Sequence, residues 1–356
     1  MRARIILTCA VLTLSISACA AGEGFELRTG ELEGVPYALA VPQEWNGTLL
    51  LQAHGSRSPD APLLADLDVE DPANLALLDD GWLIAFSAYR RNGPIVLDAA
   101  YDLLALRAHV AATYGAPGRV LVEGWSMGAA VATVLVELHA GQIDGACAVG
   151  PRYSRPVPGE DLNFTREPRR PLLLLSNMGE SADARAYQKA ATEAGASAVF
   201  WTVGRYGHVN LNAAERLEAL RALSDWVTRD LKPEPRELLV VMTPESVAAR
   251  DEGAISANVL SIDPVYSNLE TSFVPGDLAW LGVAEGGLVR IVAAGGSTGA
   301  LYGKSYNSVA PDRGVIFPNA EGRLTIAVNR GSAVERLGCV AGDILTVSPW
   351  DGTGRP

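Results

Sequence analysis

Six short runs of apolar residues recur between residues 48 and 204, and they constrain the fold more than any other feature. Each run is apolar on both faces, as expected for parallel strands buried on both sides of a sheet. Longer segments rich in Ala and Leu lie between them, several ending at a Gly that favours a helix end. This alternation predicts a doubly wound, mostly parallel α/β sheet. The expected strands are 48–54, 82–88, 119–125, 145–150, 171–177 and 198–204, and the clearest helices are 97–115, 128–141 and 183–195.

The sequence changes in character after residue 231. The amphipathic segment 215–230 runs into LKPEPREL, where two prolines stand among charged residues, as expected for a last helix followed by a linker. Beyond it, alternating apolar segments lie between turns rich in Gly, Pro and Asn, which favours strands. We therefore expect three parts: a first domain over 25–231, a linker over 232–237 and a smaller β-rich domain over 238–349.

The first eighteen residues have the features of an export signal. Arg2 and Arg4 precede an apolar run that is too short to cross a bilayer. The stretch ISAC, which ends at Cys19, resembles the lipobox of bacterial lipoproteins, and this resemblance implies cleavage before Cys19 and lipidation of its thiol. The alternative is ordinary cleavage near the same site, which would release a soluble secreted protein. In both cases we expect an exported protein, anchored in the first case to a bacterial membrane facing the periplasm or the cell surface.

Charge and cysteine content argue against two classes of protein, nucleic-acid-binding proteins and disulfide-rich proteins. Loss of Arg2 and Arg4 with the leader changes the formal net charge from −12 to −14, and so acidic a surface argues against nucleic-acid binding. After processing, the remaining thiols other than Cys19 are Cys147 and Cys339, one in each half of the chain. We expect two buried free thiols rather than a disulfide framework. The sequence does not indicate an oligomeric state.

One serine stands between two glycines at the end of the third expected strand. The stretch GWSMG at 124–128 has the form G-x-S-x-G, which is weak evidence alone because the chain has 36 glycines. Its setting is more specific, since it follows a strand and opens a helix, as a nucleophile elbow requires. The start of the helix also leaves backbone amides free to stabilise an oxyanion. Ser126 is therefore a candidate nucleophile.

A serine nucleophile needs a base, and the chain has only four histidines. His109 and His139 fall within or near the end of expected helices, where structural roles are common. His54 belongs to QAHGS after the first buried strand, where an HG pair shapes the oxyanion loop. His208 remains, in a Gly-rich loop directly after the last expected strand. It is therefore the candidate base.

The third member of a triad should be a carboxylate after the strand at 171–177. Glu180 and Asp183 both satisfy this condition. Asp183 has the shorter side chain, but it falls in the first turn of an expected helix, where the helix dipole explains a carboxylate without catalysis. Glu180 precedes that turn and is freer to point at the site, so we favour Glu180 and keep Asp183 as the alternative.

Residues 25–230 resemble the α/β-hydrolase superfamily, with the elbow, the HG loop, the acid loop and the late GH pair in the family's order. The resemblance implies acyl transfer through a covalent intermediate, with Ser126 as nucleophile, His208 as base and Glu180 (or Asp183) as the acid. It also implies that the oxyanion is held by the backbone amides of Met127 and Ser56. Neither a cofactor nor a metal ion is expected.

Substrate class is less specified by the sequence. Only twenty residues, 151–170, separate two core strands where many lipases insert a lid, so we expect a small cap and an open site. GWSMG also resembles the elbow of secreted polyester hydrolases, but the match covers five residues. A carboxylesterase acting on small-molecule or extended esters is the favoured hypothesis, and amide substrates stay open.

Two resemblances compete for the C-terminal region. Residues 262–273 and 306–347 resemble the C-terminal β-barrel domain of the S-adenosyl-L-methionine hydroxide adenosyltransferases, which implies that Asn268 lies nearest to a bound nucleoside. Residues 331–347 also have the form of the loop, helix and strand of a PDZ peptide-binding fold. The alternative function for the whole chain is a lipid-anchored binding protein with a degenerate hydrolase scaffold and a nucleoside- or peptide-binding (PDZ-like) second domain.

Overall fold

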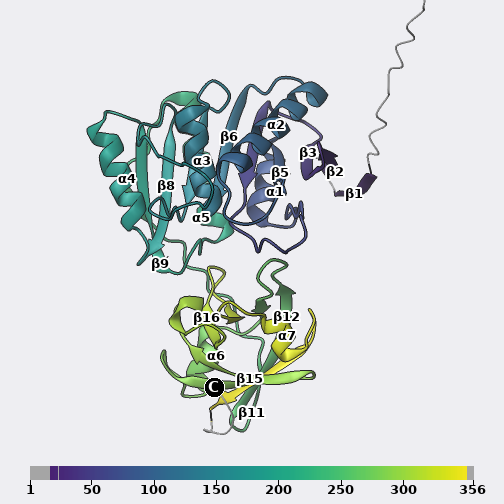
Figure 1. The fold of residues 1–356 in the computed structure, drawn as a ribbon. Helices are drawn as coiled ribbons and strands as arrows, with labels where there is room; N and C mark the ends of the chain where they lie inside the picture. Colours follow the sequence, from purple (N-terminus) through teal and green to yellow (C-terminus); the bar gives the residue numbers. More distant parts are fainter. Residues whose placement is uncertain (1–16, 23, 351–356) are drawn as a thin grey trace, which may run out of the picture.

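The computed structural model describes residues 17–22 and 24–350, which form two separate sheets (Figure 1). The expected leader, residues 1–18, lies outside the described residues except for its last two. Cys19 belongs to the first described strand, and its lipidation stays a prediction.

The first domain is built on a ten-stranded sheet in the order β1-β2-β3-β5-β4-β6-β7-β8-β9-β10. Strands β4 to β10 run parallel with their neighbours, whereas β1, β2 and β3 form an antiparallel edge on β5. The six expected strands correspond to β4 to β9, so the predicted α/β sheet is confirmed. The strands are β1 Ser17–Gly22, β2 Phe25–Leu32, β3 Val35–Pro42, β4 Thr48–Ala53, β5 Leu83–Ser87, β6 Arg119–Trp125, β7 Gly145–Val149, β8 Leu172–Met178, β9 Ala198–Tyr206 and β10 Arg236–Leu238.

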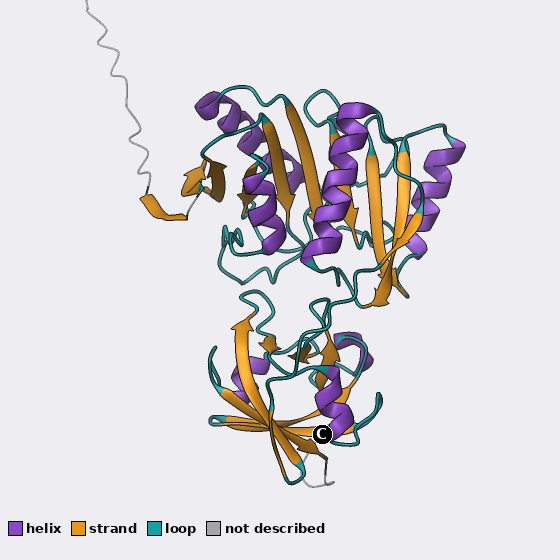
Figure 2. Ribbon diagram, turned by 180° about the vertical axis from the view of Figure 1, so that it is seen from behind, coloured by secondary structure: helices purple, strands orange, loops and turns teal. Residues whose placement is uncertain are grey.

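Helices cover both faces of this sheet, as Figure 2 shows. The apolar side chains of α2 (Leu97–Tyr114), α3 (Met127–Leu138) and α4 (Ala182–Glu193) share one core with the sheet. Those of α1 (Pro72–Asp79) and α5 (Ala213–Arg229) share a second core on the other face. Alternation along a strand supplies both cores, since Leu49 and Leu51 face the first and Leu50 faces the second. This explains why the strands are apolar on both faces.

The proline-rich segment after α5 differs from the predicted linker. Its last part forms β10, which pairs in parallel with β9, and Leu238 is buried. The indole of Trp201 donates to the Glu234 carbonyl (2.8 Å), and the guanidinium of Arg236 lies 4.1 Å from the centre of the Trp201 ring. The linker predicted over 232–237 thus overlaps β10 at its end. The helix itself ends at Arg229 with Asp230 in a left-handed conformation, and the chain after the two prolines adds the edge strand.

The second domain is a small closed barrel. Seven strands form its ring, which closes because β12 pairs with both β13 and β18. The predicted β-rich barrel is thus confirmed, and its core is the apolar interior of the ring. Its strands are β11 Ala249–Asp251, β12 Ala254–Ile262, β13 Leu269–Thr271, β14 Leu288–Ala293, β15 Gly296–Tyr302, β16 Gly314–Pro318, β17 Leu324–Val328 and β18 Ile344–Pro349, with helices α6 Pro275–Trp280, α7 Ala333–Leu337 and the short 3₁₀ helix η1 Tyr306–Ser308.

The thiols of Cys147 and Cys339 are free and buried, one in each domain.

None of the helices formed by the described residues is both long and apolar enough to cross a bilayer.

Two glycines bring β4, β6 and α3 into close contact. A Cβ atom added to Gly128 would lie 1.9 Å from the carbonyl oxygen of Ala53, and one added to Gly124 would lie 2.0 Å from that of Gly128. Both obstacles are backbone oxygens, one in β4 and one in the first turn of α3, which cannot move aside independently. The approach of the helix to the sheet therefore requires glycine at both positions.

We predict that Gly128→Ala lowers the free energy of unfolding by about 1–3 kcal/mol through overpacking. Gly141→Ala is the matched control, because a Cβ there meets nothing within 4 Å and should change stability by less than about 0.5 kcal/mol. Urea unfolding followed by circular dichroism measures both. Equal stability of the two variants would contradict the packing described here.

Candidate active site

Ser126 occupies a sharp turn between β6 and α3. Its backbone has φ 56° and ψ −113°, a combination that non-glycine residues rarely adopt and that costs free energy. The Ser126 N–H donates to the carbonyl of Val149 at the end of β7 (2.8 Å), which ties the turn to the neighbouring strand. The side chain is partly exposed at the carboxyl end of the sheet. This is the conformation that a nucleophile elbow requires.

Ser126 and His208 share a hydrogen bond, and His208 in turn contacts Glu180. The distance from Ser126 Oγ to His208 Nε2 is 2.8 Å, and that from His208 Nδ1 to Glu180 Oε2 is 2.6 Å. The same carboxylate oxygen lies 3.5 Å from an Arg152 guanidinium nitrogen. The three side chains come from the ends of β6, β8 and β9, and they form one continuous hydrogen-bonded chain. In this arrangement the carboxylate can fix the tautomer of the imidazole, and the imidazole can accept the serine proton.

Asp183 lies elsewhere. It is in the first turn of α4, where its carboxylate accepts hydrogen bonds from the backbone N–H (3.0 Å) and the hydroxyl (2.8 Å) of Ser154. These contacts hold the segment 151–170 against the domain. The structure therefore places Glu180, and not the alternative Asp183, beside His208.

A residue to which the sequence patterns assign no functional role holds the loops of the base and the acid together. Asn177 is fully buried near the end of β8, and its side-chain amide donates to the carbonyls of Arg205 (3.1 Å) and Asn210 (2.9 Å). Its side-chain oxygen accepts from the N–H of Asn210 (2.8 Å). A polar residue at the end of the apolar run PLLLLSN was the available signal, since such a group needs hydrogen-bond partners when it is buried.

The expected oxyanion groups lie on either side of Ser126. Met127 begins α3, where backbone amides have no acceptor within the helix. The HG loop approaches from the other side, since a Cβ added to Gly55 would lie 3.3 Å from Ser126 Cβ. Ser56 follows in that loop. The two amides proposed for the oxyanion therefore belong to segments that border the serine.

The other three histidines are distant from this hydrogen-bonded chain or are structural. The His54 ring stacks on Tyr89 at 4.0 Å, its Nδ1 lies 2.7 Å from the Gly55 carbonyl, and burial lowers its pKa to about 4, with Arg57 adding to the effect. The ring is thus neutral at pH 7 and shapes the HG loop. His109 contacts the hydroxyl of Tyr37 (3.1 Å), and His139 caps the end of α3.

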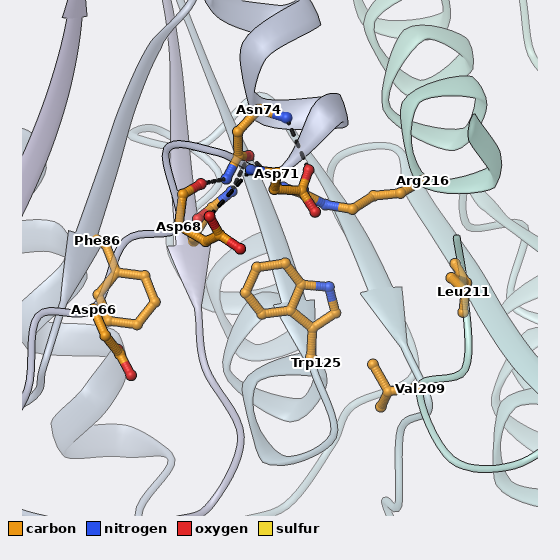
Figure 3. Close-up of a pocket in the computed structure, with 10 residues that line it drawn as sticks. Asp66, Asp68, Asp71, Asn74, Phe86, Trp125, Val209, Leu211 and Arg216 are labelled. Atoms are coloured by element: carbon orange, nitrogen blue, oxygen red, sulfur yellow. Dashed lines mark hydrogen bonds and ion pairs between the residues drawn. The ribbon is translucent and has the colours of Figure 1, made fainter. Parts of the chain in front are cut away.

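A cavity of about 250 Å³ is lined by Trp125 and Val209, which are the neighbours in sequence of Ser126 and His208, and by several polar side chains. Figure 3 shows the indole of Trp125 among Asp68, Asp71 and Arg216. Arg216 joins Asp71 (2.7 Å) to Glu123, which is fully buried (2.6 Å). The guanidinium also lies 5.3 Å from the centre of the Trp125 ring. The charges of Arg216, Asp71 and Glu123 are therefore paired with one another. Because Glu123 belongs to β6, these ion pairs fix the strand that leads into the Ser126 turn.

Among residues 17–22 and 24–350, no three His, Cys, Asp or Glu side chains gather as metal ligands would. Asn268, the expected ligand-binding residue of the barrel, ends a tight turn in which its carbonyl accepts from the Asp263 N–H (3.0 Å). That turn, 263–268, faces the HG loop, because the Tyr266 hydroxyl donates to the carbonyl of Ser56 (3.2 Å).

Comparison with known proteins assigns the two domains separately. Residues 257–346 match the family model of the SAM hydroxide adenosyltransferase C-terminal domain. This match overturns the PDZ alternative for the barrel.

Among solved structures, an uncharacterized conserved protein from Thermotoga maritima is 22% identical over 31% of this chain, with a TM-score of 0.27, and the chain spans only 41% of that protein. The HSL homologue EstE7 from a metagenome library is 18% identical over 59% of this chain and 89% of its own (TM-score 0.47). An esterase from the bacterial hormone-sensitive lipase family is 16% identical over 60% and 87%, respectively (TM-score 0.46).

Strand order, strand direction and the strained turn after β6 are those of the α/β-hydrolase fold. The chain therefore joins a domain of the α/β-hydrolase fold to a barrel that matches the SAM hydroxide adenosyltransferase C-terminal domain family.

Proposed function

We propose that this protein is an exported serine hydrolase, a carboxylesterase that acts through Ser126, His208 and Glu180. The observation that carries the proposal is the continuous hydrogen-bonded chain of these side chains, at 2.8 and 2.6 Å. Its location adds support, because the serine stands on a strained turn that exposes Oγ at the carboxyl end of the sheet.

In the first half-reaction, Ser126 Oγ attacks the ester carbonyl carbon while His208 Nε2 takes the hydroxyl proton. The tetrahedral oxyanion is stabilised by the amides of Met127 and Ser56, each worth roughly 10²- to 10³-fold in rate. Collapse of this intermediate breaks the bond to the alcohol, which leaves with the proton from the imidazolium. An acyl group then remains on Ser126.

In the second half-reaction, water attacks the acyl-enzyme as His208 takes one of its protons. The second tetrahedral intermediate collapses, and the proton returns to Ser126 Oγ as the carboxylic acid leaves. Glu180 accepts a hydrogen bond from Nδ1 and holds the imidazole in the tautomer that presents Nε2 to the serine. No step requires a cofactor.

The first prediction from this proposed function concerns the nucleophile. We expect the purified protein to hydrolyse p-nitrophenyl esters and to react with a fluorophosphonate probe, and we expect Ser126→Ala to lose both properties. Hydrolysis without Ser126 would contradict the proposal. A wild-type protein that neither hydrolyses esters nor labels would favour the alternative, a binding protein on a degenerate hydrolase scaffold.

The second prediction separates the two carboxylates. Glu180→Gln should lower kcat by roughly 10³- to 10⁴-fold, because the neutral amide no longer fixes the imidazole tautomer. Asp183→Asn is the matched control and should mainly lower stability, by about 0.3–1 kcal/mol, since its carboxylate lies in the first turn of α4. Steady-state kinetics on both variants measures the difference. A large loss of kcat confined to Asp183→Asn would reverse the assignment.

A third prediction concerns the membrane anchor. If Cys19 is lipidated after removal of residues 1–18, the protein expressed with its leader in bacteria should sediment with membranes and incorporate labelled palmitate. Cys19→Ala should abolish the incorporation and shift the protein to the soluble exported fraction. Equal distribution of both forms would instead indicate a secreted soluble esterase.

A further inference from the structure

The barrel presents several loops to the carboxyl edge of the α/β sheet, where the proposed triad lies. Figures 1 and 2 show the barrel beyond the end of β9, with its loops directed towards the first domain. Hydrogen bonds join the two domains directly. In one of them, the side-chain amide of Asn212 donates to the Ala320 carbonyl (3.3 Å). The expectation of an open site under a small cap therefore considered only the insertion 151–170 and omitted the second domain.

Tyr266 reaches the oxyanion side of the site. Its hydroxyl donates to the carbonyl of Ser56 (3.2 Å), one residue after the Gly55 that packs against Ser126. The turn that carries it is held by Asp263, whose carboxylate accepts the N–H groups of Val265 (2.7 Å) and Tyr266 (2.9 Å). The Tyr266 side chain is nevertheless 55% exposed. A large ring is thus held in a fixed position beside the HG loop with much of its surface free.

A second loop of the barrel reaches the end of β9, beside the loops of the base and the acid. Lys304 lies over the ring of Tyr206, 4.5 Å from its centre, and Tyr206 precedes His208 by two residues. A Cβ atom added to Gly179, next to Glu180, would lie 3.5 Å from the same ring. Tyr306 follows in η1 and is partly buried. Burial raises the pKa of Tyr306, so its hydroxyl stays neutral at pH 7.

The two tyrosines therefore belong to the two barrel loops that contact the first domain beside the site, Tyr266 at the HG loop and Tyr306 two residues after the Lys304 that lies over Tyr206. Aromatic side chains suit such a boundary, because a ring covers a large area while losing little rotational entropy.

We propose that the barrel is a fixed lid of the esterase, in which Tyr266 and Tyr306 limit the length of the acyl group and make short-acyl esters the substrates. This inference rests on the proposed function. In this proposal the acyl chain on Ser126 extends between the HG loop and the acid loop and therefore meets the two rings. Removal of a ring opens that path and lets additional methylenes be buried, each worth about 0.8 kcal/mol, or roughly fourfold in binding.

The test measures kcat/KM of the full-length protein for p-nitrophenyl acetate and p-nitrophenyl octanoate. In Tyr266→Ala and Tyr306→Ala, we expect the octanoate to acetate ratio to rise at least about tenfold over wild type. Tyr266→Phe and Tyr306→Phe keep the rings and should keep the wild-type ratio. Tyr101→Ala, which removes a 56% exposed ring from α2, should also leave the ratio unchanged.

Titration with a fluorophosphonate gives the fraction of reactive serine in every sample, and circular dichroism gives the fold. An unchanged ratio in both alanine variants, with the serine reactive and the fold intact, would overturn the lid while leaving the esterase proposal standing. A change in the phenylalanine variants as large as that in the alanine variants would also overturn it, since the rings are then not the barrier. Absence of hydrolysis and labelling in wild type would instead overturn the proposed function.

Discussion

The backbone conformation of Ser126 is the constraint on which the rest of the site depends. A residue at φ 56° and ψ −113° is strained, and it persists only where the surrounding structure determines it. Here β6 enters the turn and α3 leaves it, while the contact of Gly128 with the Ala53 carbonyl holds the helix against the neighbouring β4. Because the sheet is buried on both faces, neither element can shift to relieve the strain. The packing of the central core thus holds the Ser126 hydroxyl in a partly exposed position at the carboxyl end of the sheet.

Buried polar groups hold the surrounding loops relative to this turn. Asn177 joins the end of β8 to the loop of His208 by three hydrogen bonds, and Arg216 pairs with the fully buried Glu123 of β6. Such groups are costly to bury, and removal of one partner leaves the other unsatisfied. The loops that these buried groups join can therefore adopt few other conformations without leaving a buried polar atom unpaired. The result is that side chains from three strand ends meet with hydrogen-bond geometry, as proposed for catalysis.

Local sequence patterns predict much of this architecture. The apolar runs predict β4 to β9 because each strand is buried on both faces, and the glycines around Ser126 predict the elbow because only glycine fits there. Glu180 could be preferred to Asp183 because helix-forming residues begin after it. The position of the barrel could not be predicted in this way. The contact between Tyr266 and Ser56 joins residues 210 positions apart, and β10 pairs at an edge that short-range periodicity does not describe.

The central claim is that Ser126 is an activated nucleophile that carries the acyl group during turnover. Rapid mixing of the protein with a p-nitrophenyl ester, followed by acid quench and mass spectrometry of the peptides, tests it most directly. We expect a burst of p-nitrophenol that approaches one equivalent per protein, together with a single acyl adduct on the peptide that contains Ser126. An adduct on another residue, or steady hydrolysis with neither a burst nor an adduct under conditions where deacylation is slow, would contradict the account.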